Sequence, residues 1–414
     1  MTSTEKALGT LTEAELEALE STKDYLADPY EALRFFFLSS KDDFETAKGY
    51  EPDFVETIWP EEKIPGYKNL SAKIYVNMKT LDYYIDMQYD DRMSGSPHLE
   101  TGMTDPLKDR AFINFHSSKE SFFATFDEKP TLLPGLHKVP VLTHFKFMRR
   151  LDLLLRFFVE DVIPINVDDS DWEMYTVANE EGYLMAYMCA YRFYQFPDRY
   201  KLRLSQIWVL PMCEGEGHAS ALMDQLISEW STNSGGVEVD VESPCDDMLA
   251  FIIGYHIPRI LRHPELSVFL TEETVSKERL LQLRHELGIP VVHALHCYEM
   301  YHLVMALFAI DYDTSIVIGD DEMEEVDRTQ LVINLFAGGE DLLRPIRLAS
   351  KRRFFYMYHN DPDMEETFQD EDDRKKLLEN LWLSDCAIYL RYIPRLAKKI
   401  RDSMILKEKR GEHH

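Results

Sequence analysis

The stretch WVLPMCEGEGHASALMDQLISEW, residues 208–230, constrains the fold of this chain more than any other segment. A hydrophobic run ends at Pro211, a loop with two glycines follows, and an amphipathic segment comes next. Leu222, Leu226 and Trp230 recur every four residues, which predicts one apolar face of a helix. The first turn of such a helix offers unpaired backbone N–H groups and the positive end of the helix dipole. The segment therefore predicts a strand, a glycine loop and a helix that can hold a phosphate.

Two common phosphate-binding loops do not fit this segment. No Gly-Lys-Ser/Thr follows, which excludes a P-loop, and GxGxxG is absent, which disfavours a dinucleotide-binding loop. An ordinary tight turn stays open as the alternative. Glu214 and Glu216 are compatible with an anion held by main-chain donors, because their side chains can point to solvent. Each adds a like charge near the phosphate at a cost of about 1 kcal/mol or less, so we expect weaker cofactor binding than with neutral residues there.

The composition narrows the classes of protein that remain. The chain has 414 residues, 45% of them apolar, so two or three domains with substantial cores are expected. No long uncharged apolar run occurs, and the first residues lack the basic and apolar regions of a signal peptide, so neither a membrane span nor a leader is expected. The five cysteines are odd in number and include no CxxC pair, which indicates free thiols in a reducing compartment.

The charge is strongly negative. The chain has 74 Asp and Glu against 45 Lys and Arg, a formal net charge of −29. Such a surface repels nucleic acid and anionic lipid and attracts cationic partners. Solubility alone is the simpler explanation and stays open.

The rest of the chain divides into a mixed part and a helical part. Residues 12–38 are expected to be helical, since Thr12 and Glu15 resemble a capping box before an apolar stripe. Alternation in residues 70–78 and the run 81–89 predict two strands. The further expected elements are a helix over 143–162, strands over 172–179, 183–196 and 202–210, and helices from about 258 onward.

The stretch VEVDVESP, residues 237–244, alternates valines with carboxylates. Glu238, Asp240 and Glu242 therefore share one face of a predicted strand. This face is either the solvated side of an edge strand or a row of carboxylates beside a reaction centre. In the second case it would hold a cationic amine, and Glu242, where the strand ends, would take its proton.

The histidines and cysteines show no pattern for a metal or a covalent nucleophile. His293 and His296 lie three residues apart, with His302 beyond, but no carboxylate or cysteine has a matching spacing. They are expected to be ordinary helix histidines, and no metal is expected. The spacing around Cys213 and Cys245 does not support an acyl-carrying thiol.

Several motifs together resemble one family. A strand, Gln206-x-x-x-Leu210-Pro211, a glycine loop, a helix and a strand that ends in an acid before Pro244 resemble the GNAT acetyltransferase superfamily. Within it, the resemblance is to the type B histone acetyltransferases, and it spans about residues 50–305. The segments that carry it are IWPEEKIPGYKNL (58–70), INVDDSDW (165–172), YRFYQFPDRYKLRLSQIWVLP (191–211) and VSKERLLQLRHELGIPVVHALHCYEMYHL (275–303).

This resemblance implies an α+β fold. An amino-terminal mixed α/β domain (1–138) would contact the histone tail, a GNAT core (139–258) would bind acetyl-CoA, and a carboxy-terminal helical region (259–414) would follow. Acetyl-CoA would be the co-substrate, with no metal. The implied acetyl-CoA contacts are Ile207, Trp208 and Val209 along the strand, and the amides of Glu214, Gly215, Glu216, Gly217, His218, Ala219 and Ser220 around the pyrophosphate.

The resemblance also implies catalytic roles. Glu242 takes the position of the general base, and the like charges of Glu238 and Asp240 should raise its pKa. Asp240 and Glu180 are the next candidates for this role. A backbone N–H near Val209 would stabilise the developing oxyanion. The implied contacts with the histone tail are Glu61, Glu62, Tyr191, Arg192 and Phe193.

The implied reaction is direct transfer of acetyl from acetyl-CoA to a lysine ε-amine in a core histone tail, that of newly synthesised histone four. The basic tail would be the main partner, a β-propeller histone chaperone is a second, and neither nucleic acid nor a membrane is expected. The nucleus and cytoplasm are the implied locations. Two alternatives stay open: a chaperone-like histone-binding module with a degenerate site, and a GNAT enzyme that acts on a small amine.

Overall fold

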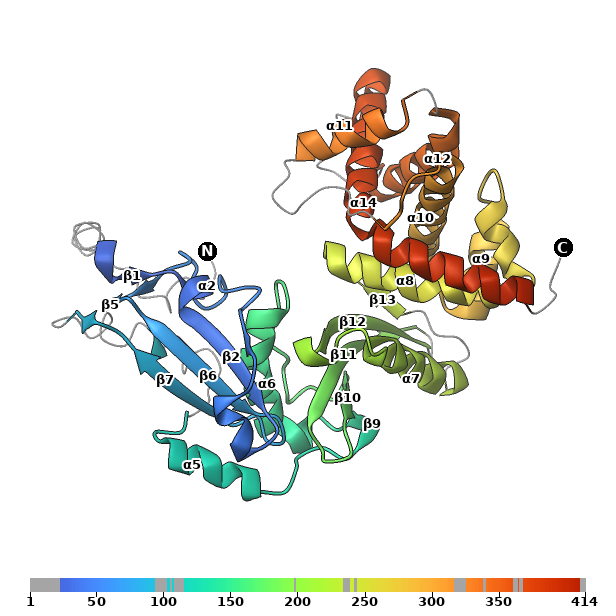
Figure 1. Ribbon diagram of the computed structural model, residues 1–414. Helices are drawn as coiled ribbons and strands as arrows, with labels where there is room; N and C mark the ends of the chain where they lie inside the picture. Colours follow the sequence, from blue (N-terminus) through green and yellow to red (C-terminus); the bar gives the residue numbers. More distant parts are fainter. Residues whose placement is uncertain are drawn as a thin grey trace. The chain divides into compact units, whose positions relative to one another are not determined.

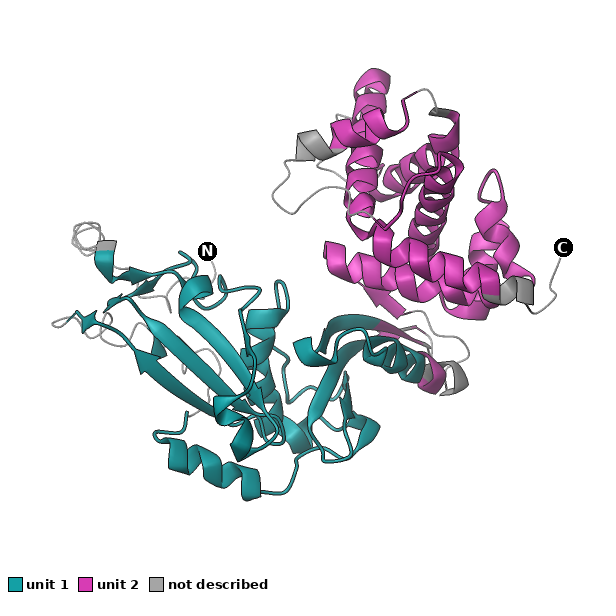
Figure 2. Ribbon diagram, in the orientation of Figure 1, with its two compact units in different colours: residues 1–193, 203–226 teal, residues 194–202, 227–414 magenta. Residues whose placement is uncertain are grey.

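The computed structural model describes residues 23–93, 103–104, 106–107, 115–196, 199–233, 239–241, 244–315, 325–337, 340–359, 364 and 368–409. The chain divides into two compact units (Figure 2). Unit 1 comprises residues 1–193 and 203–226, and unit 2 comprises residues 194–202 and 227–414. Unit 1 thus contains the amino-terminal sheet together with most of residues 139–258, the predicted acetyl-CoA-binding core. Within the described ranges, no helix is both long and apolar enough to cross a membrane.

The amino-terminal part of unit 1 is built on a four-stranded sheet (Figure 1). Its order is β3 (Gly49–Tyr50), β2 (Leu33–Leu38), β6 (Ser71–Asn77) and β7 (Tyr83–Gln88). The pair β2–β6 is parallel, and β7 returns antiparallel to β6. The remaining elements are β1 (Leu26–Ala27) paired with β4 (Ile64–Pro65), β5 (Tyr67–Lys68) paired with β8 (Asp91–Arg92), and the helices α2 (Pro29–Ala32) and α5 (Lys119–Ala124).

The helix predicted for residues 12–38 is wrong where the structure describes it. The short helix α2 ends at Ala32, and residues 33–38 form strand β2, while residues 12–22 lie outside the described residues. Leu33 and Phe35 are completely buried on one face of β2. Parallel pairing with β6 gives this segment a partner that local periodicity does not reveal. The strands predicted for 70–78 and 81–89 are confirmed as β6 and β7.

The second sheet has five strands. Their order is β13 (Val239–Val241), β12 (Arg199–Val209), β11 (Leu184–Gln195), β10 (Trp172–Ala178) and β9 (Gly135–Val139). The strands predicted for 172–179, 183–196 and 202–210 are confirmed as β10, β11 and β12, and residues 239–241 of the stretch 237–244 form β13. The neighbouring predicted helices are confirmed as α6 (Phe145–Phe158) and α7 (His218–Asn233), whereas β9 was not predicted as a strand. The division between the two units runs through this sheet, because residues 194–202 and 239–241 group with the helices that follow.

Helix α6 packs against both sheets of unit 1. The ring of Phe157 lies 4.8 Å from that of Phe35 on β2, and Phe158 stacks on Trp208 of β12 at 5.5 Å. Phe37 reaches Trp208 directly, at 6.2 Å. Each aromatic pair of this kind contributes about 0.5–1.5 kcal/mol beyond the burial of apolar surface. The amino-terminal sheet and the predicted cofactor strand therefore share one core.

Unit 2 is mostly helical, which confirms the helices predicted after residue 258, although the first of them begins earlier, at Asp246. Helix α9 begins where the Ser276 side chain accepts from the Arg279 N–H, and it ends at Gly288 with a left-handed φ of 65°. Helix α10 is buried on nearly every side, as its apolar composition requires. The helices are α8 (Asp246–Arg262), α9 (Lys277–Leu287), α10 (Val291–Ala309), α11 (Glu325–Leu335), α12 (Glu340–Tyr358) and α14 (Glu371–Lys409).

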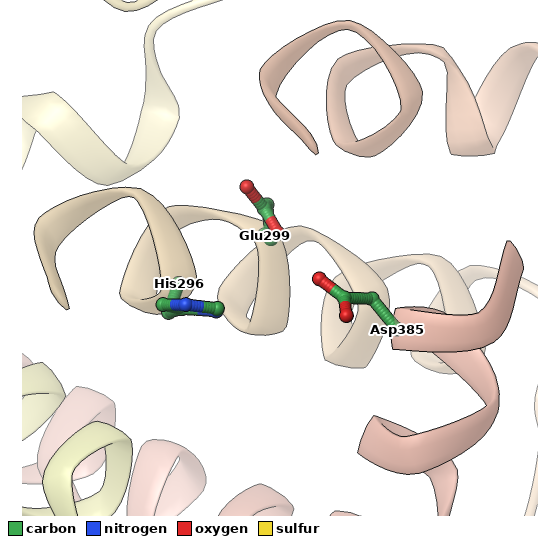
Figure 3. Close-up of side chains that lie close together, drawn as sticks. All are labelled: His296, Glu299 and Asp385. Atoms are coloured by element: carbon green, nitrogen blue, oxygen red, sulfur yellow. The ribbon is translucent and has the colours of Figure 1, made fainter. Parts of the chain in front are cut away.

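A buried polar network joins three of these helices. His296 and Glu299 project from α10 and Asp385 from α14 (Figure 3). Arg353 of α12 donates to both Glu299 oxygens, at 3.1 and 3.0 Å, and also pairs with Asp385. The Tyr389 hydroxyl donates to Glu299 at 3.0 Å and lies 2.5 Å from His296 Nδ1. Burial raises the pKa of both carboxyls, and the Arg353 charge opposes this shift. The guanidinium supplies the positive charge that a metal ion would bring, so the cluster is a structural network.

Replacing Glu299 by glutamine should destabilise unit 2 by about 3–5 kcal/mol, because it removes a buried charge and leaves Arg353 undercompensated. Glu379 provides the matched control, since it pairs with Arg347 and Lys351 but remains about one third exposed. Glu379→Gln should cost about 1 kcal/mol or less. Urea unfolding of the full chain, followed by circular dichroism, measures both. Equal losses for the two variants would contradict the assignment.

Acid should also destabilise unit 2 through its buried histidines. Burial lowers the pKa of His293 to about 4, and it lowers the pKa of His256 well below its usual value. Below pH 6.5 the unfolded chain binds protons that the folded His293 does not, so stability falls as the pH drops from 6.5 to 4. His293 alone accounts for about 3 kcal/mol of this loss. In His293→Gln the urea midpoint should depend less on pH, and parallel curves for variant and wild type would contradict this account.

Candidate functional site

The predicted cofactor strand is the end of β12. Trp208 is 6% exposed and anchors the strand on α6, while its neighbours Ile207 and Val209 are half-buried on the opposite face. Just after the strand ends at Val209, the N–H of Leu210 donates to the carbonyl of Met185 on β11 at 3.0 Å, which holds this end of the strand in place. A single 3₁₀ turn that begins at Pro211 then leads into the glycine loop.

Both glycines of the loop adopt a backbone conformation that favours glycine. Gly215 and Gly217 have φ values of 79° and 89°, in the left-handed region that side chains disfavour. A Cβ at either position would meet no atom of a non-neighbouring residue within 4 Å, so backbone conformation favours glycine here and crowding by the rest of the protein does not. Helix α7 starts directly afterwards, and its first bond runs from the Ala221 N–H to the Gly217 carbonyl. The N–H groups of residues 218–220 therefore remain available to a ligand.

The two acids of the loop are exposed. Glu214 and Glu216 both lie at the surface, and the Glu216 carboxylate is 3.0 Å from Nε2 of His218. Apart from the flanking residues, no protein atom lies within 4 Å of the place where a Cβ on Gly215 or Gly217 would stand. The loop thus fits a pyrophosphate held by main-chain groups, with an open cradle that a Cβ would partly fill.

The segment INVDDSDW lies against the end of β11. The Tyr191 hydroxyl donates to Asp169 at 3.1 Å, and this bond raises the pKa of Tyr191. The ring of Tyr191 also meets Trp172 edge-on at 4.9 Å. Arg192 donates twice to Asp171, at 2.5 and 3.0 Å. The structure therefore brings two of the predicted tail contacts, Tyr191 and Arg192, onto the acidic segment.

Phe193 continues this aromatic group. Its ring lies 4.7 Å from Tyr191, and the Arg203 guanidinium lies 4.8 Å from its centre. Phe193 is more than one third exposed. Cations therefore cover part of this surface, and Asp171 is already paired, so the segment is less acidic than its sequence indicates.

The other predicted acids lie elsewhere. Glu61 and Glu62 are exposed, and no hydrogen bond or ion pair joins their side chains to the described residues. Glu180 is exposed in the turn between β10 and β11, a turn held by the Asn179 side chain. Asp240 lies on β13 in unit 2, 2.7 Å from Lys201. Glu242, like Glu238, lies outside the described residues.

We did not predict from the sequence that two polar side chains of unit 1 would be buried and hydrogen-bonded inside the sheet. Glu173 is a buried carboxylate on β10 that pairs with Lys138 and accepts from the Tyr175 hydroxyl at 3.2 Å. Gln206 is buried on β12, immediately before the predicted cofactor contacts. The sequence could have indicated this burial, because Gln206 lies two residues from both Leu204 and Trp208 and therefore shares their face of the strand, which is turned to the core.

Comparison with known families defines the class of domain. Residues 148–252 match the family model described as "Acetyltransferase (GNAT) family". Strands β10 to β13, helix α7 and most of α6 lie within the residues that match this GNAT acetyltransferase model, and the predicted α+β fold is confirmed. Residues 25–140 match the model "Histone acetyl transferase HAT1 N-terminus".

Curated relatives confirm the predicted resemblance to type B histone acetyltransferases. The catalytic subunit from Zea mays is 28% identical over 216 residues, which is 44% of this chain and 45% of the relative. The Arabidopsis thaliana subunit is 23% identical over 266 residues, 55% of this chain and 56% of the relative. The Rattus norvegicus subunit is 24% identical over 173 residues, 39% and 40% of the two chains. The chain thus spans about half the length of the curated relatives it matches.

Solved structures add only a partial match. An aminoglycoside acetyltransferase from an uncultured soil metagenomic sample, in complex with sisomicin, covers 28% of this chain and 81% of its own at 13% identity, with a TM-score of 0.24. This similarity is too limited to bear on the substrate.

Gly217→Val should abolish acetyl-CoA binding, because a β-branched residue resists a φ of 89° and its side chain would occupy the cradle. Gly135→Val is the matched control, since Gly135 also has a positive φ, of 95°, but lies at the start of β9. That variant should carry similar backbone strain and keep its affinity for acetyl-CoA. Calorimetric titration of the two folded variants decides, and unchanged affinity in Gly217→Val would remove the cofactor from this loop.

Proposed function

We propose that this protein transfers acetyl from acetyl-CoA to a lysine ε-amine in the amino-terminal tail of a core histone, that of newly synthesised histone four. The observation that carries the proposal is the open glycine cradle at the start of α7, next to a strand anchored by Trp208. Its presence in a chain that matches both a GNAT model and a type B amino-terminal model supports a histone as the acceptor.

The residues of the loop and strand fit acetyl-CoA. Amides from Glu214 to Ser220 would hold the pyrophosphate, and the half-buried edge of Ile207–Val209 would lie along the pantetheine arm. Acetyl-CoA would supply a thioester: the lysine nitrogen forms a bond to its carbonyl carbon, the carbon–sulfur bond breaks, and coenzyme A leaves as a thiolate that takes up a proton. A backbone N–H near Val209 would donate to the oxygen on which charge develops. Glu242 would take the proton from the attacking amine, directly or through water.

The net charge of −29 supports a basic tail as the partner. Because Asp171 and Glu173 already pair with Arg192 and Lys138, this charge acts mainly as a long-range field that raises the rate of encounter. The exposed Glu61 and Glu62, with Tyr191, Arg192 and Phe193, remain the proposed tail contacts. A β-propeller histone chaperone as a second partner, and residence in the nucleus and cytoplasm, belong to the same proposal.

The direct test is incubation with acetyl-CoA and a histone four tail peptide, followed by mass spectrometry. A mass increase of one acetyl group on a peptide lysine supports the proposal. Spermidine as the competing acceptor tests the small-amine alternative, and its preferred acetylation would overturn the histone assignment. Tail binding without acetyl-CoA-dependent thermal stabilisation would favour a chaperone-like module.

Glu242→Gln should lower kcat by about 10²–10⁴, the range for a lost general base, with acetyl-CoA affinity nearly unchanged. Asp240→Asn is the matched control on the same predicted strand face. Since Asp240 already pairs with Lys201, its replacement should have a smaller effect on kcat. Steady-state kinetics with the tail peptide compares the two. A larger loss in Asp240→Asn, or a kcat for Glu242→Gln near that of wild type, would move the base away from Glu242.

A further inference from the structure

A chain of buried hydrogen bonds crosses the second sheet inside unit 1. The side chain of Gln206 on β12 is 2% exposed, and its Oε1 accepts from the Tyr187 hydroxyl of β11 at 3.0 Å. Its Nε2 donates to the backbone carbonyl of Ile163 at 2.6 Å. Ile163 belongs to the connection between α6 and β10. One buried amide therefore ties two strands to a loop that has no regular structure of its own.

Packing of the core does not require an amide side chain at residue 206. Leu204 and Trp208 flank Gln206 on the same face of β12, and both are buried and apolar. An apolar residue would fit this face, whereas a buried amide is tolerated only if its polar atoms find partners. Both ends of Gln206 do so. The residue therefore secures something that packing would not, namely the position of the Ile163 carbonyl.

Ile163 presents an apolar side chain to solvent. Its side chain is 72% exposed although its carbonyl is held by a buried group. The same connection continues into Asp169, which accepts from Tyr191, and into Asp171, which binds Arg192. The loop is thus fixed near one end by Gln206 and near the other by the segment proposed to contact the tail.

The direction of β12 places this loop at the reactive end of acetyl-CoA. If the pyrophosphate lies on the loop that follows Val209, the pantetheine arm runs back along β12 from residue 209 toward residue 207. The thioester then lies toward Gln206 and not toward the glycine loop. This step rests on the proposed function, while the contacts of Gln206 do not.

We propose that Gln206 is a positioning residue for the acceptor. By holding the Ile163 carbonyl it sets residues 163–171 beside the thioester end of the cofactor strand, and the exposed Ile163 side chain contacts the apolar part of the acceptor segment around the target lysine. Ile163 is then a specificity residue, and Gln206 acts through it without touching either substrate.

The kinetic test compares four full-length variants in acetylation of the tail peptide. Ile163→Ser should raise KM for the peptide about tenfold, the lower range for loss of one apolar contact, with KM for acetyl-CoA unchanged. Gln206→Met keeps the length of the side chain but removes the amide, and should raise peptide KM similarly. Tyr187→Phe spares the bond to Ile163 and should change it little. Leu133→Ser, at another side chain in unit 1 with 70% exposure, is the control that should have no effect.

The double variant Gln206→Met/Ile163→Ser makes the test sharper. If Gln206 acts through Ile163, the second substitution adds little to the first, so the two effects on peptide KM are strongly non-additive. Multiplicative effects would overturn the inference. So would a Gln206→Met protein that loses thermal stability and acetyl-CoA affinity but keeps its peptide KM, because that pattern indicates a purely structural role.

Hydrogen exchange separates this inference from the proposed function. In Gln206→Met the backbone amides of residues 163–171 should exchange faster than in wild type, while those of β6 and α10 stay unchanged, and no acceptor is needed for this measurement. Unchanged exchange in 163–171 would overturn the positioning role even if the enzyme acetylates histone tails. Faster exchange in a protein that acetylates no peptide would instead overturn the proposed function and the specificity role of Ile163, while it would support the hold of Gln206 on residues 163–171.

Discussion

The packing of α6 between two sheets is the interaction on which the structure of unit 1 depends. Phe157 and Phe158 are adjacent in sequence and therefore point in different directions from the helix. Phe157 contacts Phe35 of the amino-terminal sheet, while Phe158 contacts Phe35 as well and stacks on Trp208 of the second sheet. Because Trp208 lies within the cofactor strand, the same contact that joins the sheets also fixes the strand along which acetyl-CoA is proposed to bind. A substitution in this core would therefore affect both the amino-terminal sheet and the proposed cofactor strand.

Electrostatics act differently at the surface and inside this protein. The net charge of −29 is a property of the whole chain, but several acids near the candidate site are already neutralised. Asp171 binds Arg192, and Glu173 is buried beside Lys138. These pairs organise the local structure and leave less free negative charge than a count of residues indicates. Attraction of a basic tail then depends on the summed field more than on any one carboxylate.

Unit 2 is stabilised by a buried polar network within its helices. The two family-model matches end at residues 140 and 252, so most of this unit lies beyond them. Its central helix α10 combines an apolar surface with Glu299, a carboxylate that is fully buried and satisfied by Arg353 and Tyr389. A network of this kind is costly if one member is lost, and it restricts the ways in which α10, α12 and α14 can pack.

The sequence by itself determined the elements whose signals are local. The glycine loop, helix α7, the long strands of the second sheet and the helices after residue 258 follow from periodicity and from residues that favour turns, and Gly217 has the positive φ that its type allows. Together with the order of the motifs, these signals carry the resemblance to the type B histone acetyltransferases. Tertiary structure alone decided the rest. Residues 33–38 became a strand because β6 offers a parallel partner whose paired residues lie 39 positions further along the chain, an interaction that no local pattern encodes. Gln206 was visible as a motif residue, yet its bonds to Tyr187 and Ile163 exist only because folding brings three distant segments within hydrogen-bonding distance.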